Sequence, residues 1–215
     1  QILNNAGLIE LDALSTLSQI GSGLSIQGND SLESVAGLAQ VTALIDGNAS
    51  IQNNASLASL TGLESIPSIL GSLTLRNNDA LADLSGLEGL KLIDGALTVA
   101  DNEGLTQLTG LETLTSLTGF LDIHGNTSLE NVTGLKGLSG SLGGGNKVVI
   151  YGNPALVDLT GLSAITSIEG KLQLSDCDSL PTLNGLHNLA QVTKALQIEN
   201  NASLLHLDHL STLTE

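Results

Sequence analysis

Aromatic residues and cysteine are scarce in this chain. Among its 215 residues there is one Phe, one Tyr, no Trp and no Met, although 41% of the residues are hydrophobic. A core must therefore be built almost wholly from Leu, Ile, Val and Ala. Cys177 is the single cysteine, which excludes an intrachain disulfide framework and a cysteine-rich metal site.

Basic residues are also few. Six Lys and Arg residues stand against 22 Asp and Glu residues, which gives a formal net charge of −16. This charge repels phosphate backbones and anionic lipid headgroups, so we expect no nucleic-acid partner. Polar residues interrupt the apolar ones every few positions, and no stretch reaches the roughly 18 apolar residues that membrane insertion needs. The chain opens with Gln1 rather than Met, which favours a piece of a longer, processed protein.

The sequence repeats itself with a period of roughly two dozen residues, which is typical of a solenoid. One unit runs from Gly71 to Leu87, and its asparagine, Asn78, recurs along the whole chain. A Gly-Leu pair follows that asparagine in a fixed phase, as at Gly86-Leu87. The recurring positions are Asn5, Asn29, Asn54, Asn78, Asn102, Asn126, Asn153, Cys177 and Asn201.

Each unit begins with a short alternating segment. Leu73 and Leu75 alternate with Ser72, Thr74 and Arg76, which predicts a strand with one buried face. One such strand per coil, always in the same direction, stacks as a parallel sheet with about 4.8 Å between layers. Later apolar positions recur every few residues and return the chain around the same core, as short strands or as single helical turns.

The repeated asparagine lies where the chain leaves the strand and exposes backbone N–H and C=O groups. A side-chain amide supplies both a donor and an acceptor, so stacked Asn side chains can satisfy these groups in neighbouring coils. We therefore predict a buried asparagine ladder. Cys177 cannot act in this way, so we predict a buried, unreactive thiol there and a locally weaker ladder.

The unit from Gly71 to Leu87, with its strand, Asn and Gly-Leu in one phase, resembles the repeat of receptor L domains of insulin- and epidermal-growth-factor-type receptors. It is more similar still to the fungal cell-wall and microbial surface proteins that carry L-domain-like repeats. The resemblance implies a right-handed solenoid, secreted or at the cell surface, that binds or supports and does not catalyse. Receptor L domains carry disulfide-bonded caps, which a chain with one cysteine lacks.

We therefore predict a right-handed parallel β-helix, or leucine-rich-repeat-like β-solenoid, of about nine coils of roughly 24 residues. Residues 1–215 form one domain, either as part of a longer chain or stacked end to end with other copies. Residues 139–147 form a Gly-rich loop inserted where the repeat is longest. End-to-end self-association would make the chain a subunit of a filament or surface layer, which is one alternative function.

The break in the repeat marks our main candidate site, because a purely structural coil has no reason to change. The chain's only Phe and only Tyr fall on outward strand positions beside the predicted loop. Exposed aromatics there suit a protein or carbohydrate surface as partner, so we predict recognition or adhesion. The same rows continue with Lys171, Gln173 and Ser175. The predicted patch consists of Phe120, Asp122, His124, Lys147, Val149 and Tyr151.

A row of hydroxyl residues before the Gly-Leu pair suggests another alternative, ice binding. Regularly spaced Thr on a rigid face can order surface water, but neighbouring positions such as Asp83 and Gln107 mix charge and size. The row consists of Thr61, Ser85, Thr109, Thr133 and Thr160.

We find no catalytic set, and we expect no cofactor and no metal. The segment from His206 to His209 is nearest to a metal constellation, but strand alternation would splay its members. Among the Asn-x-Ser/Thr sequons, those in the predicted ladder would be buried. Asn48 and Asn131 are left as glycosylation candidates.

Overall fold

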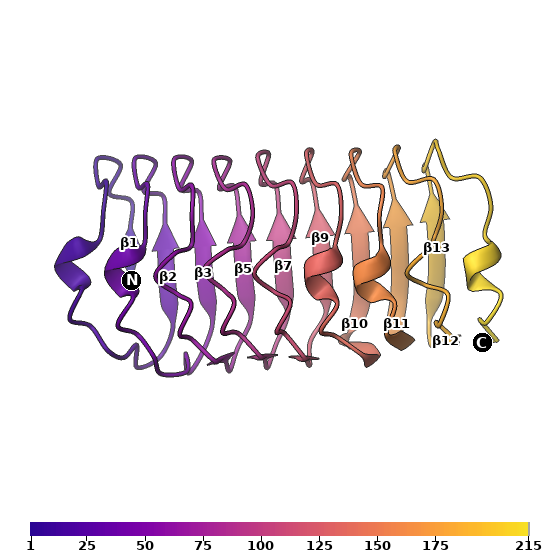
Figure 1. The fold of residues 1–215 in the computed structure, drawn as a ribbon, viewed down its shortest axis with the longest axis horizontal. Helices are drawn as coiled ribbons and strands as arrows, with labels where there is room; N and C mark the ends of the chain where they lie inside the picture. The colour runs from indigo at the N-terminus through magenta and orange to yellow at the C-terminus, as the bar shows by residue number, and fades with distance from the viewer. Residues whose placement is uncertain (215) are drawn as a thin grey trace.

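The computed structural model describes residues 1–214, except for the side chains of residues 145 and 146. It is a parallel β-solenoid whose coils stack side by side, with the two termini at opposite ends of the stack (Figure 1). The predicted fold class is confirmed. Each recurring unit of the sequence forms one coil.

The main sheet contains a row made of one strand from each coil, and all of these strands run in the same direction (Figure 1). Leu73, Leu97 and Leu121 lie next to one another in register, and all three are buried. The alternate residues Thr74 and Thr98 face outward, as the sequence alternation predicts. The strands of this row are β1 (Ile2–Leu3), β2 (Leu24–Gln27), β3 (Ala49–Gln52), β5 (Leu73–Arg76), β7 (Leu97–Ala100), β9 (Leu121–His124), β10 (Gly140–Tyr151), β11 (Ile165–Ser175) and β13 (Ala195–Glu199).

The opposite wall contains both of the structures that the sequence left open. A small parallel sheet forms where the chain turns back toward the main sheet, and single 3-10 turns form at several Gly-Leu positions. No described helix is long and apolar enough to cross a membrane. The small sheet consists of β4 (Ser68–Ile69), β6 (Leu92–Ile93) and β8 (Ser116–Leu117). A further short strand, β12 (Gln191–Val192), pairs with β11 and so belongs to the main sheet. The 3-10 helices are η1 (Asp12–Leu14), η2 (Ala36–Leu38), η3 (Thr133–Leu135), η4 (Thr160–Leu162) and η5 (Asp208–Leu210).

A glutamate distinguishes some open turns from the 3-10 turns. In three neighbouring coils a Glu stands two residues after the Gly, and its Oε2 accepts the Gly N–H at 2.8 to 2.9 Å. These Gly residues have φ between 111° and 114°. Where that later residue is Ala39, Lys136 or Ser163, the segment is a 3-10 helix. The Gly and Glu pairs are Gly62 with Glu64, Gly86 with Glu88, and Gly110 with Glu112.

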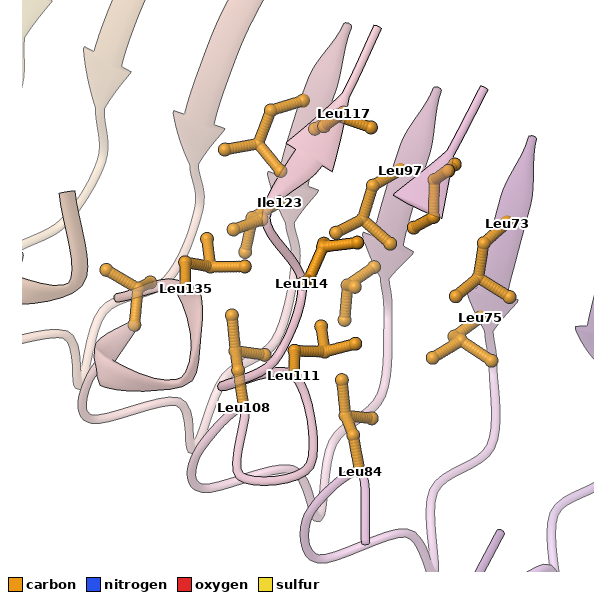
Figure 2. Close-up of a cluster of buried hydrophobic side chains, with 14 of the residues drawn as sticks. Leu73, Leu75, Leu84, Leu97, Leu108, Leu111, Leu114, Leu117, Ile123 and Leu135 are labelled. Carbon is orange, nitrogen blue, oxygen red and sulfur yellow. The ribbon is translucent and has the colours of Figure 1, made fainter. Parts of the chain in front are cut away.

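The core is a continuous column of aliphatic side chains between the two walls. Leu73 and Leu97 extend from the main sheet, while Leu84, Leu108 and Leu111 extend from the opposite wall into the same interior (Figure 2). All five are at most 1% exposed. Fully burying one such side chain contributes about 1.5–3 kcal/mol, so the small aliphatic residues are enough to hold each coil.

Asparagine side chains form a buried ladder from Asn29 to Asn153, while at the ends of the predicted ladder Asn5 is exposed and Asn201 is partly buried. The Asn102 Nδ2 donates to the Leu75 carbonyl oxygen and to the Asn126 Oδ1, both at 3.1 Å, and the Asn102 backbone N–H donates to the same Asn126 Oδ1. Each buried amide thus joins its own coil to both neighbours. The fully buried members are Asn29, Asn54, Asn78, Asn102, Asn126 and Asn153.

The residue before each ladder position has a left-handed backbone. Its φ lies between 52° and 67° in every coil. Only Gly, Asn and Asp occupy these positions, because they adopt this conformation at the lowest cost. The residues are Asn4, Gly28, Asn53, Asn77, Asp101, Gly125, Gly152, Asp176 and Asn200.

Cys177 interrupts the ladder. Its side chain is fully buried, and burial raises the pKa of the thiol to about 11. The thiolate fraction at neutral pH is therefore very small, which makes the thiol a poor nucleophile. Its backbone N–H still donates to the Asn201 Oδ1 at 3.0 Å, but its sulfur replaces the amide oxygen that Asn153 would otherwise face.

We expect Cys177→Asn to stabilise the protein by about 1 kcal/mol, because the new amide would restore hydrogen bonds on both sides of the gap. Urea unfolding followed by circular dichroism would measure the change. Cys177→Ala is the control, since it removes the thiol without adding an amide. Equal stability of the two variants would show that the ladder gains nothing from completion at this coil.

The segment 139–147, which we expected to be a Gly-rich loop, is mostly strand. β10 runs from Gly140 to Tyr151 and pairs with β11 at Gly140–Leu142 and again at Asn146–Tyr151. The extra residues are absorbed in a register shift between Leu142 and Asn146, and Gly143 has a φ of 89° within it. The prediction was wrong because a Gly-rich composition is shared by loops and by bulged strands.

The two end coils carry most of the exposed large apolar side chains. A further coil, from this chain or from another molecule, would cover them. End-to-end stacking therefore stays a prediction. These residues are Leu3, Ile9 and Leu17 at one end and Leu196, Leu205 and Leu207 at the other.

Candidate functional site

The predicted patch lies on the outer face of the main sheet, where β9 and β10 are paired. Asp122 lies next to Val149, and His124 lies next to Tyr151. Phe120 comes directly before β9, and the Lys147 Nζ lies 4.7 Å from the centre of its ring. An ammonium group over a ring face is attracted by the ring quadrupole. The structure therefore brings together side chains from two consecutive coils.

Asp122 is the charged centre of this patch. Its two carboxylate oxygens bind different partners: Oδ2 forms an ion pair with the Lys147 Nζ, and Oδ1 lies 2.7 Å from the His124 Nδ1. The Asp122 residue is only 8% exposed, so water screens these contacts weakly. The carboxylate therefore fixes the positions of both the lysine and the imidazole.

The two rings on the outer row stack on each other. The His124 and Tyr151 ring centroids are 4.7 Å apart and the ring planes differ by 9°. This distance matches the spacing of about 4.8 Å between paired strands, so the sheet itself sets the stacking. The His124 Nε2 lies 3.9 Å from the Asp101 Oδ2. The same Asp101 oxygen forms an ion pair with the Arg76 Nη2 at 2.9 Å.

Each aromatic ring has a large neighbour on one side and a small one on the other. Tyr151 stacks on His124, but in the next coil its partner in register is Ser175. Phe120 lies under Lys147, while the preceding coil places Ala96 at the matching position. Tyr151 and Phe120 are both partly exposed. One face of each ring is therefore turned toward a short side chain rather than a second ring.

Two residues of the predicted patch are less accessible than their outward positions suggested. Asp122 and Val149 are 8% and 5% exposed. They support the surface rather than form it. We use the name aromatic cluster for the partly exposed side chains of the patch together with the Asp122 carboxylate that binds two of them. The cluster consists of Phe120, Asp122, His124, Lys147 and Tyr151.

β11 extends the aromatic cluster by one coil. Lys171 is the register partner of Lys147, and its Nζ donates to the Gln173 Oε1 at 2.8 Å. The Gln173 Nε2 in turn donates to the Ser175 Oγ at 3.0 Å. Lys171, Gln173 and Ser175 continue the outward rows of the sequence, but the predicted patch did not include them. Their register with the β10 residues of the patch was the signal that would have added them.

The hydroxyl row proposed for ice binding lies at the turns of the opposite wall. Thr133 and Thr160 donate their hydroxyls to Asn131 and Asp158, two residues earlier. The Thr61 hydroxyl likewise lies 2.8 Å from that of Ser59. Of the row, only Thr61 is exposed, while Ser85, Thr109, Thr133 and Thr160 are partly buried. Several of these hydroxyls thus form hydrogen bonds within their own turns.

The two glycosylation candidates differ in their surroundings. Asn48 is exposed, and its Oδ1 accepts the Ser72 N–H at 2.8 Å. Asn131 is partly buried, and its Oδ1 accepts both the N–H and the hydroxyl of Thr133. Glycosylation at either asparagine stays a prediction.

The histidines near the C-terminal end lie closer together than strand alternation suggested. The His206 Nδ1 lies 3.3 Å from the Asp208 Oδ2, and the His206 and His209 rings stack with centroids 6.0 Å apart. A 3-10 turn at Asp208–Leu210, rather than a strand, brings them together. Within residues 1–214, no three His, Cys, Asp or Glu side chains are arranged to hold a metal ion.

Comparison with known proteins gives similarity to solved structures alone. No protein-family model matches the chain, and no curated protein matches it. Among solved structures, the chain is similar to an internalin from Listeria monocytogenes str. 4b F2365, with 18% sequence identity over 95% of this chain and 86% of the internalin and a TM-score of 0.29. At that TM-score the likeness adds nothing to the solenoid seen directly and does not bear on function.

Proposed function

We propose that the chain is a non-enzymatic recognition or adhesion scaffold, secreted or held at a cell surface, that binds a partner through the outer face of its main sheet. The observation that carries this proposal is the aromatic cluster. The chain has a single Phe and a single Tyr, and both lie in it, next to the Lys147 and His124 side chains that the Asp122 carboxylate binds. Rigid aromatic anchors of this kind dominate the binding energy of protein and carbohydrate contacts.

The chemistry of the cluster favours contact over catalysis. An Asp and His pair occurs in hydrolases, where the second imidazole nitrogen faces a Ser or Cys nucleophile. Here the His124 Nε2 faces the Asp101 carboxylate at 3.9 Å. The Asp122 carboxylate is already committed to Lys147 and His124. The side chains support one another and leave the Tyr151 ring to meet a partner.

The proposal is tested by applying the labelled chain to arrays of extracellular proteins and of glycans. For a ligand that binds saturably, we expect Tyr151→Ala to weaken binding by about 30-fold, because truncating an aromatic anchor typically costs about 2 kcal/mol. Gln52→Ala is the matched control, since Gln52 lies on the same outward row several coils away. Thermal unfolding would confirm that both variants are folded.

If Gln52→Ala weakened binding of a ligand and Tyr151→Ala did not, the binding surface would lie in the N-terminal half of the sheet and not at the aromatic cluster. Phe120→Ala provides a second test of the cluster. It removes the ring under Lys147 while leaving the stacked His124 and Tyr151 in place. We expect it to weaken the same ligand by a similar factor.

A further inference from the structure

We propose that the partner of the aromatic cluster is an acidic polysaccharide, a chain of sugars that carry carboxylates, and that Lys171 selects for its charge. This inference rests on the proposed function, since it names the class of ligand for the same face. It comes from the distribution of the few basic side chains. Three of the six Lys and Arg residues lie in consecutive coils near one edge of the sheet: Lys147, Lys171 and Lys194.

The first two lysines have different electrostatic surroundings. The Lys147 ammonium is paired with the Asp122 carboxylate, so its charge is largely compensated. The Lys171 Nζ binds the Gln173 amide oxygen at 2.8 Å, and among the described residues it forms no ion pair. Gln173 therefore holds the Lys171 ammonium in place without neutralising it. A fixed cation with an amide partner can form a charge-assisted hydrogen bond to an incoming anion.

The net charge of −16 does not prevent this contact, because charges at a surface are screened beyond about 8 Å at physiological ionic strength. The charged groups close to Lys171 therefore determine whether an anion is attracted there. Glu169 is the nearest acidic residue along the strand, and its Oε1 accepts the Ser141 hydroxyl at 3.0 Å. Asp122 is bound by Lys147 and His124. Lys171 is therefore a basic side chain of this face that forms no ion pair with a carboxylate among the described residues, on an otherwise acidic protein.

The partly exposed rings of this face suit sugars. A pyranose presents C–H groups on its faces, which pack against aromatic rings. The Tyr151 ring has its free side toward Ser175, and the Phe120 ring has its free side toward Ala96, so both rings have short neighbours there. Lys147 and Lys171 are register partners, which places them about 4.8 Å apart along the solenoid. Tyr151 lies beside Ser175, four residues from Lys171 on β11, so a polysaccharide lying along β11 would meet the Tyr151 ring at one end and Lys171 about 13 Å away at the other.

An acidic peptide is the less favoured partner because of the sheet topology. Extended peptides commonly bind by adding a strand to a free sheet edge. At the aromatic cluster, β9, β10 and β11 each have a paired strand on both sides. A peptide there would have to bind through its side chains alone, without main-chain hydrogen bonds to the sheet.

The test uses polygalacturonate as the probe and its fully methyl-esterified form as the neutral analogue. Isothermal titration calorimetry at low and physiological salt would give both affinities. We expect polygalacturonate to bind more tightly, with an affinity that falls as salt rises. Lys171→Gln should weaken polygalacturonate binding by about tenfold and leave binding of the esterified form unchanged. Lys91→Gln is the control, because it removes the same charge from an exposed lysine next to β6.

Three outcomes would overturn the inference. They are equal affinity for the two polysaccharides, an unchanged affinity in Lys171→Gln, and binding of poly-glutamate in place of both polysaccharides. If a neutral glycan or a protein then bound in a manner that depends on Tyr151, the proposed function would stand without its acidic ligand. If no ligand depended on Tyr151, both would fail.

Discussion

Replacing Asn102 with alanine is expected to lower the free energy of unfolding by about 4 kcal/mol. The side chain is fully buried in the middle of the ladder. Its Nδ2 donates to the Leu75 and Ala100 carbonyl oxygens, at 3.1 and 3.0 Å, and its Oδ1 accepts the Asn78 N–H at 3.0 Å. Alanine would leave the buried Asn78 N–H without this acceptor and would remove one hydrogen bond from each of the two carbonyl oxygens, although Ala100 keeps the one from the Asn77 N–H at 3.2 Å. Each such buried group costs about 1–3 kcal/mol.

Urea unfolding followed by far-ultraviolet circular dichroism would measure the loss. Asn184→Ala is the matched control, because Asn184 is an exposed asparagine in a turn, and we expect it to change the free energy by less than about 0.5 kcal/mol. A loss below about 1 kcal/mol for Asn102→Ala would mean that water enters the vacated site and replaces the amide. In that case the ladder would contribute to the shape of the turn more than to stability.

The sequence predicts the ladder and the strands well, because in a solenoid each coil repeats the surroundings of the previous one. A residue type that recurs in one phase, such as Asn78 or Leu73, must meet the same contacts in every coil. The coil that breaks the pattern is predictable for the same reason. Cys177 was expected to be buried and unreactive, and the structure places it in the ladder with a raised pKa.

Two local signals in the sequence were not used. The residue before each ladder position is always Gly, Asn or Asp, which indicates a left-handed backbone there, as at Asn77 with φ 52°. A Glu two residues after the Gly, as in Gly86 and Glu88, marks one form of open turn. Without the second signal, strands and helical turns could not be separated on the opposite wall.

The candidate site was predictable only in outline. The register of parallel strands places His124 beside Tyr151, so their proximity follows from the repeat. The contact of Lys147 with the Phe120 ring and the burial of Asp122 depend on side-chain rotamers, which a periodic pattern does not specify. Which lysine keeps a carboxylate partner also depends on such detail. That is why the role of Lys171 emerges from its distance to Gln173 and not from the sequence.

Gly110→Ala is expected to destabilise the solenoid by about 3 kcal/mol or more. The Gly-Leu pair recurs because the backbone of one coil passes directly against the carbonyl of the coil before it. A methyl group on Gly110 would overlap the Leu84 carbonyl, which is backbone and cannot move aside without separating the coils. Gly110 also has a φ of 111°, a conformation that alanine adopts only with strain.

Gly7→Ala separates this steric effect from the general effect of removing a glycine. A methyl group at Gly7 would meet nothing within 4 Å, and its backbone is not left-handed. We therefore expect Gly7→Ala to be neutral or to stabilise by up to about 1 kcal/mol, because alanine restricts the unfolded chain. Urea unfolding of both variants would compare them directly. If Gly110→Ala proved as stable as Gly7→Ala, neighbouring coils could separate at little cost, and close backbone contact would not explain why glycine recurs at this position.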